Sequence, residues 1–257
     1  SFYCTNDEGK EVGTDNGRLY VGLSWYEEGG KYNYNDINID LNGHKIDRNL
    51  KNPTKNGSVF LIESGSVRIF DSSEAQTGMI TGGNNTDDGG AFYVYEGNLY
   101  IEGAKITGNH AKNGGGIYWV SDNAFFMPGG RITGNTADEN GGGIYHDGDG
   151  ETLTGAMDNM FFGGDVQIYG NSGAGHENNN LYVDLSNTIN LTAGQRYSAE
   201  GYAYSIPNAP FKEGAVIGVT VSKGTGGFSA YPNQFNLGDD KYFFSDSDKY
   251  SIGMDYN

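Results

Sequence analysis

The sequence of 257 residues is poor in cysteine, in basic residues and in long apolar runs. Its single cysteine, Cys4, has no second cysteine with which to form an internal disulfide. No apolar run approaches the length of a membrane span, so we expect no membrane insertion. The 16 basic residues face 33 acidic ones, and a net charge of −17 repels a phosphate backbone or an anionic lipid surface. The shortage of basic residues therefore argues against nucleic acid as a partner.

Apolar residues make up only 36% of the chain, but they recur at a fixed spacing. We call one copy of the repeated spacing a round. In two consecutive rounds the apolar residues are separated by steps of eight, two and five residues: Ala91, Leu99, Ile101 and Ile106, then Ile117, Phe125, Met127 and Ile132. The interval from Ile80 to Ile106 is 26 residues, and the interval from Ile106 to Ile132 is 26 again. A fixed period of this length indicates a repeat architecture, in which a thin stacked core needs few apolar residues per repeat.

The spacing also indicates which element the repeat contains. Steps of two residues place side chains on one face of a strand, whereas a helix would need steps of three or four. A period of 26 residues holds three short strands and three turns. We therefore predict an all-β fold, a right-handed parallel β-helix (a solenoid) of about seven coils with capped ends. The predicted divisions are an N-terminal cap at 1–36, the β-helix at 37–228, and a C-terminal cap or edge segment at 229–257.

Two kinds of residue are expected to hold the coils together. The first are inward apolar residues, predicted to be buried in shared ladders: Ile39, Leu41, Ile69, Leu99, Ile101, Ile106, Phe125, Met127, Ile132 and Ile168. The second are asparagines that recur at one corner, Asn109, Asn135 and Asn171, and that are predicted to form a stacked amide ladder. Longer steps predict local insertions at 71–78 and between residues 146 and 160.

Some parallel β-helices cleave polysaccharides, so a catalytic function is one hypothesis for this chain. The residues Asn-Thr-Asp-Asp at 85–88 resemble the Asn-Thr-Asp motif of polygalacturonases. However, the same corner of the next two rounds holds ordinary polar turns at 110–113 and 136–140, and the second acid pair of that family is missing. We therefore predict that the protein is not an enzyme and has no catalytic residues.

Metal and cofactor sites are not predicted either. The four histidines, His44, His110, His146 and His176, lie in or beside polar turns without metal-ligand spacing, and are interpreted as solvated. The acidic stretch at 147–151 offers oxygen ligands for calcium but lacks the full calcium-loop pattern, and a solvated acidic loop is the favoured interpretation. The glycine runs precede strands rather than helices, so no nucleotide site is expected.

The aromatic residues are the feature of the sequence that points to a function, since the chain has 19 tyrosines and 13 phenylalanines. If the residue before each ring points inward, four rings point outward in one row: Phe92, Tyr118, Tyr145 and Tyr182. A second outward row is predicted for Tyr100, Phe126 and Phe162. Exposed rings with few lysines are typical of protein interfaces, and the inserted loop with Asp147 and Asp149 is expected to flank the first row. Two alternatives stay open: the rings only stabilise neighbouring coils, or they bind sugars.

Several stretches resemble the β-helix repeats of large surface proteins from gut Firmicutes. They are IDLNGHKI (39–46), GGGIY, ITGNTA (132–137), GAVIGVTVSKGTGGF (214–228) and YFFSDSDKYSIGM (242–254). The resemblance covers residues from about 37 to the end, and it implies an adhesin-like domain of a larger protein on the bacterial cell surface, or a secreted one. Some surface proteins of gut commensals with similar repeats are superantigen-like binders of immunoglobulin heavy-chain variable regions.

The expected function is therefore non-catalytic binding to a host protein, with an immunoglobulin Fab as the best single candidate. A glycan-binding adhesin is the alternative, and a polysaccharide lyase or hydrolase is the weaker one. The isolated domain is expected to be monomeric. The Fab expectation rests on the resemblance alone.

Overall fold

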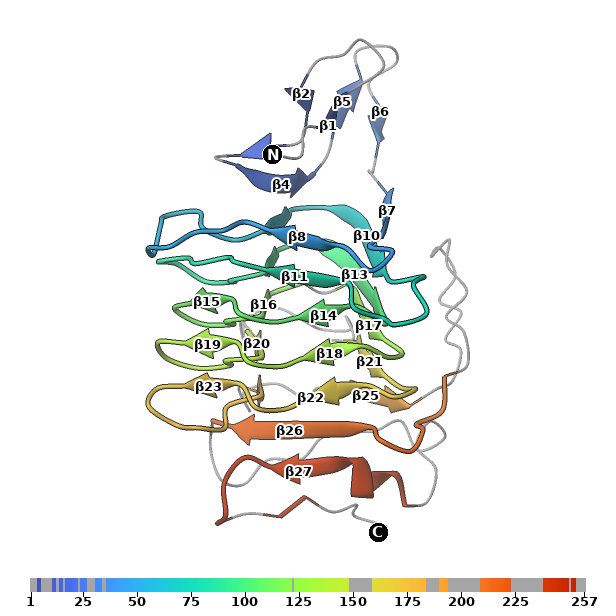
Figure 1. The fold of residues 1–257 in the computed structure, drawn as a ribbon, viewed down its shortest axis with the longest axis vertical. Coiled ribbons are helices and arrows are strands. Elements are labelled where there is room, and N and C mark those ends of the chain that lie inside the picture. Colours follow the sequence, from blue (N-terminus) through green and yellow to red (C-terminus); the bar gives the residue numbers. More distant parts are fainter. Residues whose placement is uncertain are drawn as a thin grey trace.

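The structure is a computed structural model that describes residues 4–5, 11–12, 14–15, 17–22, 24–26, 31–33, 36–121, 123–147, 159–183, 190–193, 209–222, 238–249 and 251–252. Within these ranges the protein is all-β, with 27 short strands and one 3-10 helix, η1 (Asp239–Tyr242). Figure 1 shows the strands stacked along the long axis, with the sequence running from one end of the stack to the other.

Most strands fall into three stacks, and six successive rounds of the sequence each supply one strand to every stack; β27 adds a seventh strand to the third stack. Stack A contains β4 (Arg18–Val21), β9 (Phe60–Ile62), β12 (Phe92–Val94), β16 (Ile117–Trp119), β20 (Ile144–His146) and β24 (Leu181–Val183). Stack B contains β7 (Asp36–Asp40), β10 (Gly65–Phe70), β13 (Gly97–Glu102), β17 (Ala124–Met127), β21 (Asn159–Phe162) and β25 (Asn190–Ala193). Stack C contains β8 (Lys45–Asp47), β11 (Met79–Thr81), β14 (Lys105–Ile106), β18 (Arg131–Ile132), β22 (Gln167–Ile168), β26 (Val216–Val221) and β27 (Phe243–Ser245).

The remaining strands are not part of the three stacks. β15 (His110–Ala111), β19 (Thr136–Ala137) and β23 (Ser172–Gly173) form a small parallel sheet at one corner. Among the described residues, antiparallel pairs of strands occur only toward the N-terminus: β1 (Cys4–Thr5) with β2 (Glu11–Val12), β3 (Thr14–Asp15) with β4, and β5 (Ser24–Tyr26) with β6 (Lys31–Asn33). An isolated antiparallel bridge also joins Gly173 and His176.

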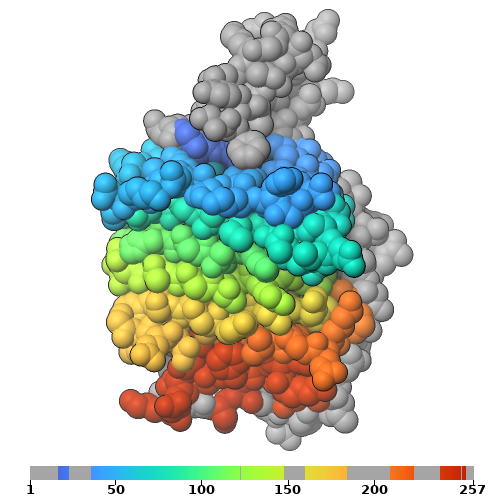
Figure 2. All heavy atoms as spheres, viewed as in Figure 1, coloured from blue at the N-terminus to red at the C-terminus, as the bar shows by residue number. Residues whose placement is uncertain are grey.

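From β7 to β26, consecutive strands of the chain go to different stacks or to the corner sheet, and neighbours within a stack are parallel. The long strand β26 pairs with β22 through Val216 and Ile217 and with β24 through Val219 to Val221. It therefore joins stacks A and C into one sheet of 14 strands, in which only the β3–β4 pair is antiparallel. Figure 2 shows the same order as layers, each layer being one stretch of sequence. The predicted all-β class is confirmed, and the layered parallel pairing is consistent with a parallel β-helix.

The core runs through the layers as ladders of apolar side chains. In stack C, one ladder contains Ile46, Ile80, Ile106, Ile132, Ile168, Ile217 and Phe243, all of them Cα partners in register and at most 9% exposed. Nine of the ten residues predicted for the inward ladders are buried. The tenth, Ile39, is only half-buried, because it lies in β7, the last strand of stack B at the N-terminal end. The ladder prediction is thus confirmed away from that end.

Parallel pairing extends past both ends of the predicted range 37–228. On the N-terminal side, β4 pairs in parallel with β9, and Leu19 faces Phe60. On the C-terminal side, β27 pairs in parallel with β26, and Phe243 faces Ile217 within the core. Residues assigned to the two caps therefore contribute strands to the same stacks.

The predicted amide ladder is confirmed and is longer than the repeat indicated. Each Nδ2 donates to the next Oδ1 at 3.0 Å from Asn109 to Asn135, from Asn135 to Asn171, and from Asn171 to Asn180. Asn180 Nδ2 then donates to Asp246 Oδ1 at 2.6 Å. All four asparagines are at most 1% exposed. Because every amide points the same way, the donor end of the ladder meets a carboxylate, which accepts a hydrogen bond and passes none on.

The insertion at 71–78 lies between β10 and β11 and is organised by one carboxylate. Asp71 accepts backbone hydrogen bonds from Gly43 at 2.8 Å, Ser73 at 3.0 Å and Gly78 at 2.5 Å. Burial acts to raise the pKa of Asp71, but the Ser73 side chain and these backbone hydrogen bonds together outweigh it, and the net pKa is lowered. The loop leaves the register of the ladders intact, since Ile80 still faces Ile46 and Ile106.

Candidate functional site

A row of four tyrosines lies on the outward side of stack A. Tyr93, Tyr118, Tyr145 and Tyr182 occupy the middle of β12, β16, β20 and β24 and are Cα partners in register. Their ring centroids are 5.3, 5.3 and 5.1 Å apart, and the interplanar angles are 17°, 4° and 10°. This spacing follows from the roughly 4.8 Å distance between neighbouring strands, so the scaffold itself stacks the rings. We call these four residues the tyrosine row.

The prediction that Phe92 belongs to this row is wrong. Phe92 is fully buried, pairs with Ile117, and stacks on Phe60 in the core at 4.8 Å. The position in the row belongs to Tyr93. The round from Phe92 to Ile117 is one residue shorter than the 26-residue period, and a slip of one residue along a strand exchanges its inward and outward faces.

The second aromatic row needs a similar correction. Phe162 was expected to point outward, but it is 2% exposed and lies in the core, and its neighbour Phe161 pairs with Phe126. Phe126 and Phe161 are themselves only 4% and 5% exposed. This row is therefore covered and offers little surface to a partner.

Exposure within the tyrosine row is uneven. Tyr118 is only 8% exposed, whereas Tyr93, Tyr145 and Tyr182 are half-buried. Tyr118 and Tyr145 each carry a neighbouring ring on both faces. The row therefore presents ring edges and hydroxyl groups rather than open ring faces.

Acidic side chains flank the N-terminal half of the row. The Tyr118 hydroxyl donates a hydrogen bond to Asp147 Oδ2. Asp88 Oδ1 accepts hydrogen bonds from the backbone N–H of Asn113 at 3.1 Å and from its Nδ2 at 3.0 Å. The predicted site residue Asp147 thus lies beside the row, while Asp149 and most of the 147–151 stretch lie outside the described residues.

The electrostatics of this region follow from burial and from the two carboxylates. Burial, then the hydrogen bond to Asp147 and the charge of Asp147, raise the pKa of Tyr118. Burial, then the charge of Asp88, raise the pKa of Tyr93. Burial also raises the pKa of Asp88, more than its bonds from Asn113 lower it. Both phenols therefore stay protonated and can donate hydrogen bonds at neutral pH.

The polygalacturonase-like stretch at 85–88 is held as a turn. Asn85 is 2% exposed; its Oδ1 accepts from the Gly57 N–H at 3.0 Å and its Nδ2 donates to the Asp88 carbonyl at 2.7 Å. In the described part of the chain, no group of three or more His, Cys, Asp or Glu side chains is placed to hold a metal ion.

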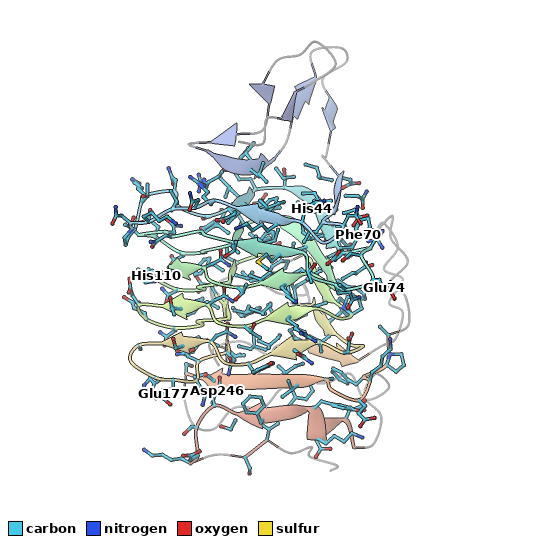
Figure 3. All side chains as sticks on the ribbon, viewed as in Figure 1. His44, Phe70, Glu74, His110, Glu177 and Asp246 are labelled. Atoms are coloured by element: carbon cyan, nitrogen blue, oxygen red, sulfur yellow. The ribbon has the colours of Figure 1, made fainter. Side chains whose placement is uncertain are left out.

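The histidines differ from the expectation at one position. His44, labelled in Figure 3, is exposed directly after the turn at 42–43, and His110, also labelled, begins the corner strand β15 and is half-buried. His110 Nδ1 lies 3.3 Å from Thr136 Oγ1, and its Nε2 lies 3.4 Å from Asp138 Oδ1. His146, which was predicted to be solvated, is instead 1% exposed and lies in register between Trp119 and Val183 on the inward side of stack A. Burial lowers the pKa of His146 to about 4.

This buried imidazole predicts acid sensitivity. The pKa of His146 is about 4 in the folded protein against 6.5 when unperturbed, so the unfolded chain binds the proton more readily. The contribution of the neutral His146 imidazole to the free energy of unfolding is therefore present above pH 6.5. About 3 kcal/mol of that free energy is lost as the pH falls to 4. Urea unfolding at pH 7 and pH 4.5 should show a smaller loss in His146→Gln than in wild type, while the exposed-residue control His44→Gln should follow wild type. Equal pH dependence in all three proteins would contradict the assignment.

Comparisons with protein-family models, with curated proteins and with solved structures found no match. Among the residues that the structure describes, no helix has the length and apolar character needed to cross a membrane. The functional argument therefore depends on the geometry of the tyrosine row and its carboxylates.

Proposed function

We propose that this chain is a right-handed parallel β-helix of about seven coils that acts as a non-catalytic binding domain of a bacterial surface or secreted protein. Its target is a host protein, and an immunoglobulin heavy-chain variable region, bound in a superantigen-like manner, is the best single candidate. The likeness of its repeats to gut Firmicutes surface proteins supports the location and this partner.

The observation that carries the binding proposal is the tyrosine row. Four tyrosines in register on neighbouring strands form a rigid surface whose side chains have little freedom to lose on binding. Tyrosine combines a large apolar area with a polar tip, which suits protein interfaces. The half-buried members Tyr93, Tyr145 and Tyr182 are the contact residues we propose.

The stacking geometry favours a protein partner over a glycan. Sugars bind aromatic side chains by lying against the ring face, but both faces of Tyr118 and Tyr145 are occupied by neighbouring rings. Ring edges and hydroxyls suit the mixed polar and apolar surface of a protein. Glycan adhesion therefore remains the alternative proposal, with less support.

We propose no catalytic role. The carboxamide of Asn85 is committed to holding a turn, and the Asp88 carboxylate accepts from Asn113. Polysaccharide cleavage by related architectures needs acids converging on one bond.

Binding to Fab fragments tests the proposal directly. We expect the protein to bind Fabs that share a heavy-chain variable family whatever their antigen specificity. Tyr93→Ala and Tyr145→Ala should each weaken that binding by about 1–3 kcal/mol, as central aromatic contacts do. Surface plasmon resonance against a panel of Fabs of known variable family measures both effects.

The matched control is Tyr169→Ala, since Tyr169 is 43% exposed and follows stack C rather than stack A. It should leave Fab affinity unchanged. Each variant also needs a melting temperature, because a ring that only holds layers together would lose stability and binding in parallel. Binding of a glycan, with no Fab bound in any variable family, would replace this proposal by the alternative.

A further inference from the structure

A second set of side chains surrounds the N-terminal member of the tyrosine row. We call it the Tyr93 patch, and it consists of Asp88, Tyr93, Tyr95, Tyr118 and Asp147. Tyr95 follows β12 and is 49% exposed, one of only two large apolar side chains that are exposed in the described ranges. Its ring is in no stacked pair in that part of the chain, so a face of the ring is open to a partner. This patch therefore has the open aromatic face that the inner rings lack.

Both carboxylates of the patch are oriented through one oxygen and leave the other unused. Asp88 is held through Oδ1 by Asn113, and Asp147 is held through Oδ2 by Tyr118. Within the described chain, Asp88 Oδ2 and Asp147 Oδ1 accept no hydrogen bond. Asp88, Asp147 and Tyr95 all act electrostatically on Tyr93, so two positioned acceptors and an exposed tyrosine ring share one surface.

Two nearby cations offset part of the negative charge of the patch. Arg18, whose positive charge favours the ionised form of Tyr93, is 8% exposed, so little of its side chain reaches the surface. The positive charge of Lys112 favours the ionised form of Asp88, but Lys112 Nζ also lies 3.7 Å from Glu139 Oε1 on the neighbouring layer. In a chain of net charge −17, the patch is complementary to a positive group.

We infer that the Tyr93 patch receives an arginine side chain of the protein partner, an inference that rests on the proposed function. A planar guanidinium can donate to the free oxygens of Asp88 and Asp147 and lie against the Tyr95 ring at the same time. The ammonium of lysine is a strongly hydrated point charge and matches the flat ring less well. A metal ion is the poorer occupant, because calcium takes six to eight oxygen ligands and the patch supplies two carboxylates.

Nuclear magnetic resonance titration of the whole chain tests this inference. The probes are three pentapeptides that differ only in a central arginine, lysine or citrulline, with spermidine as a fourth. With the arginine peptide, the ring signals of Tyr93 and Tyr95 should shift saturably. Citrulline keeps the shape but not the charge, and should bind at least about tenfold more weakly, with lysine between the two.

Variants of the chain test whether the arginine peptide binds at the Tyr93 patch. Asp88→Asn and Tyr95→Ala should each weaken binding of the arginine peptide about fivefold. The matched control is Asp165→Asn, because Asp165 is exposed and lies near Gly129 after stack B, and it should bind as wild type does. An equal loss in Asp165→Asn would mean that only the overall negative field attracts the peptide. Equal binding of citrulline, or equal shifts with spermidine, would also overturn the inference.

The two experiments distinguish a failure of this inference from a failure of the proposed function. If Fab binding persists and is weakened by Tyr93→Ala while the arginine peptide shifts nothing at the patch, the inference fails and the proposed function stands. If the arginine peptide binds at the patch and no Fab binds, the immunoglobulin assignment fails and the search turns to other arginine-bearing host proteins.

Discussion

The Asn135→Ala variant is expected to lose about 4 kcal/mol or more of unfolding free energy, enough to leave much of the protein unfolded at 37 °C. Asn135 lies at the middle of the amide ladder and is fully buried. Its Oδ1 accepts from the backbone N–H of Asn109 at 3.1 Å, and its Nδ2 donates to the Ile106 carbonyl at 2.9 Å. Truncation leaves the buried N–H of Asn109 without a partner, which costs about 1–3 kcal/mol. It also removes one hydrogen bond each from the Ile106 carbonyl, Asn109 Nδ2 and Asn171 Oδ1, which keep other partners, and each lost bond costs about 1 kcal/mol.

Urea unfolding followed by circular dichroism measures the effect. Asn52→Ala is the matched control, because Asn52 is exposed and its carbonyl, rather than its side chain, accepts from Thr54. That variant should stay within about 0.5 kcal/mol of wild type. A loss under 1 kcal/mol in Asn135→Ala would mean that water replaces the amide, and that the ladder contributes little to stability.

The repeat made the inward ladders and the amide corner predictable. A side chain that recurs every 26 residues must sit at the same place on each layer, and only one face of a strand is inward. This is why Ile80, Ile106 and Ile132 were placed correctly without any knowledge of the turns. The same reasoning placed Asn109 and Asn135 at one corner, and Asn171 joined them 36 residues further on because an insertion lengthens that round.

Outward residues were harder to predict, because they depend on register near irregular turns. Phe92 was misplaced where one round is a residue short, and Phe162 was misplaced after the long insertion. His146 had a usable signal that was missed: it follows the inward Ile144 by two residues, and the period of a strand then predicts that it points inward.

Contacts made outside the repeat had no periodic signal at all. Asn180 and Asp246 complete the amide ladder from segments whose sequences do not resemble those of the earlier rounds. Asp246 lies near the C-terminal end of the stack in Figure 3. It also accepts from the Thr220 hydroxyl at 2.7 Å, so one carboxylate ties β26, the Asn180 corner and the C-terminal strand together. The folded arrangement was needed to bring these residues to one place.

The Ile106→Ala variant is the second change with a large expected effect, a loss of about 2–5 kcal/mol of unfolding free energy. Ile106 is 1% exposed and lies in register between Ile80 and Ile132, so truncation leaves a cavity between two layers. The hydrogen bonds of the parallel strands hold the layers at a fixed spacing, so the cavity cannot close easily. Chemical denaturation should show a lower midpoint with an unchanged slope, because the surface exposed on unfolding is nearly the same.

Two companion variants separate cavity formation from other effects. Ile106→Val removes one methylene from the same site and should cost about 0.5–1.5 kcal/mol. Lys105→Ala changes the neighbouring outward residue of β14, which is half-buried, and should stay within about 0.5 kcal/mol of wild type. The graded order of Ala, Val and wild type follows from a packed ladder at this position. If Lys105→Ala instead cost as much as Ile106→Ala, the inward and outward faces of β14 would be exchanged, and with them the register of the whole isoleucine ladder in stack C.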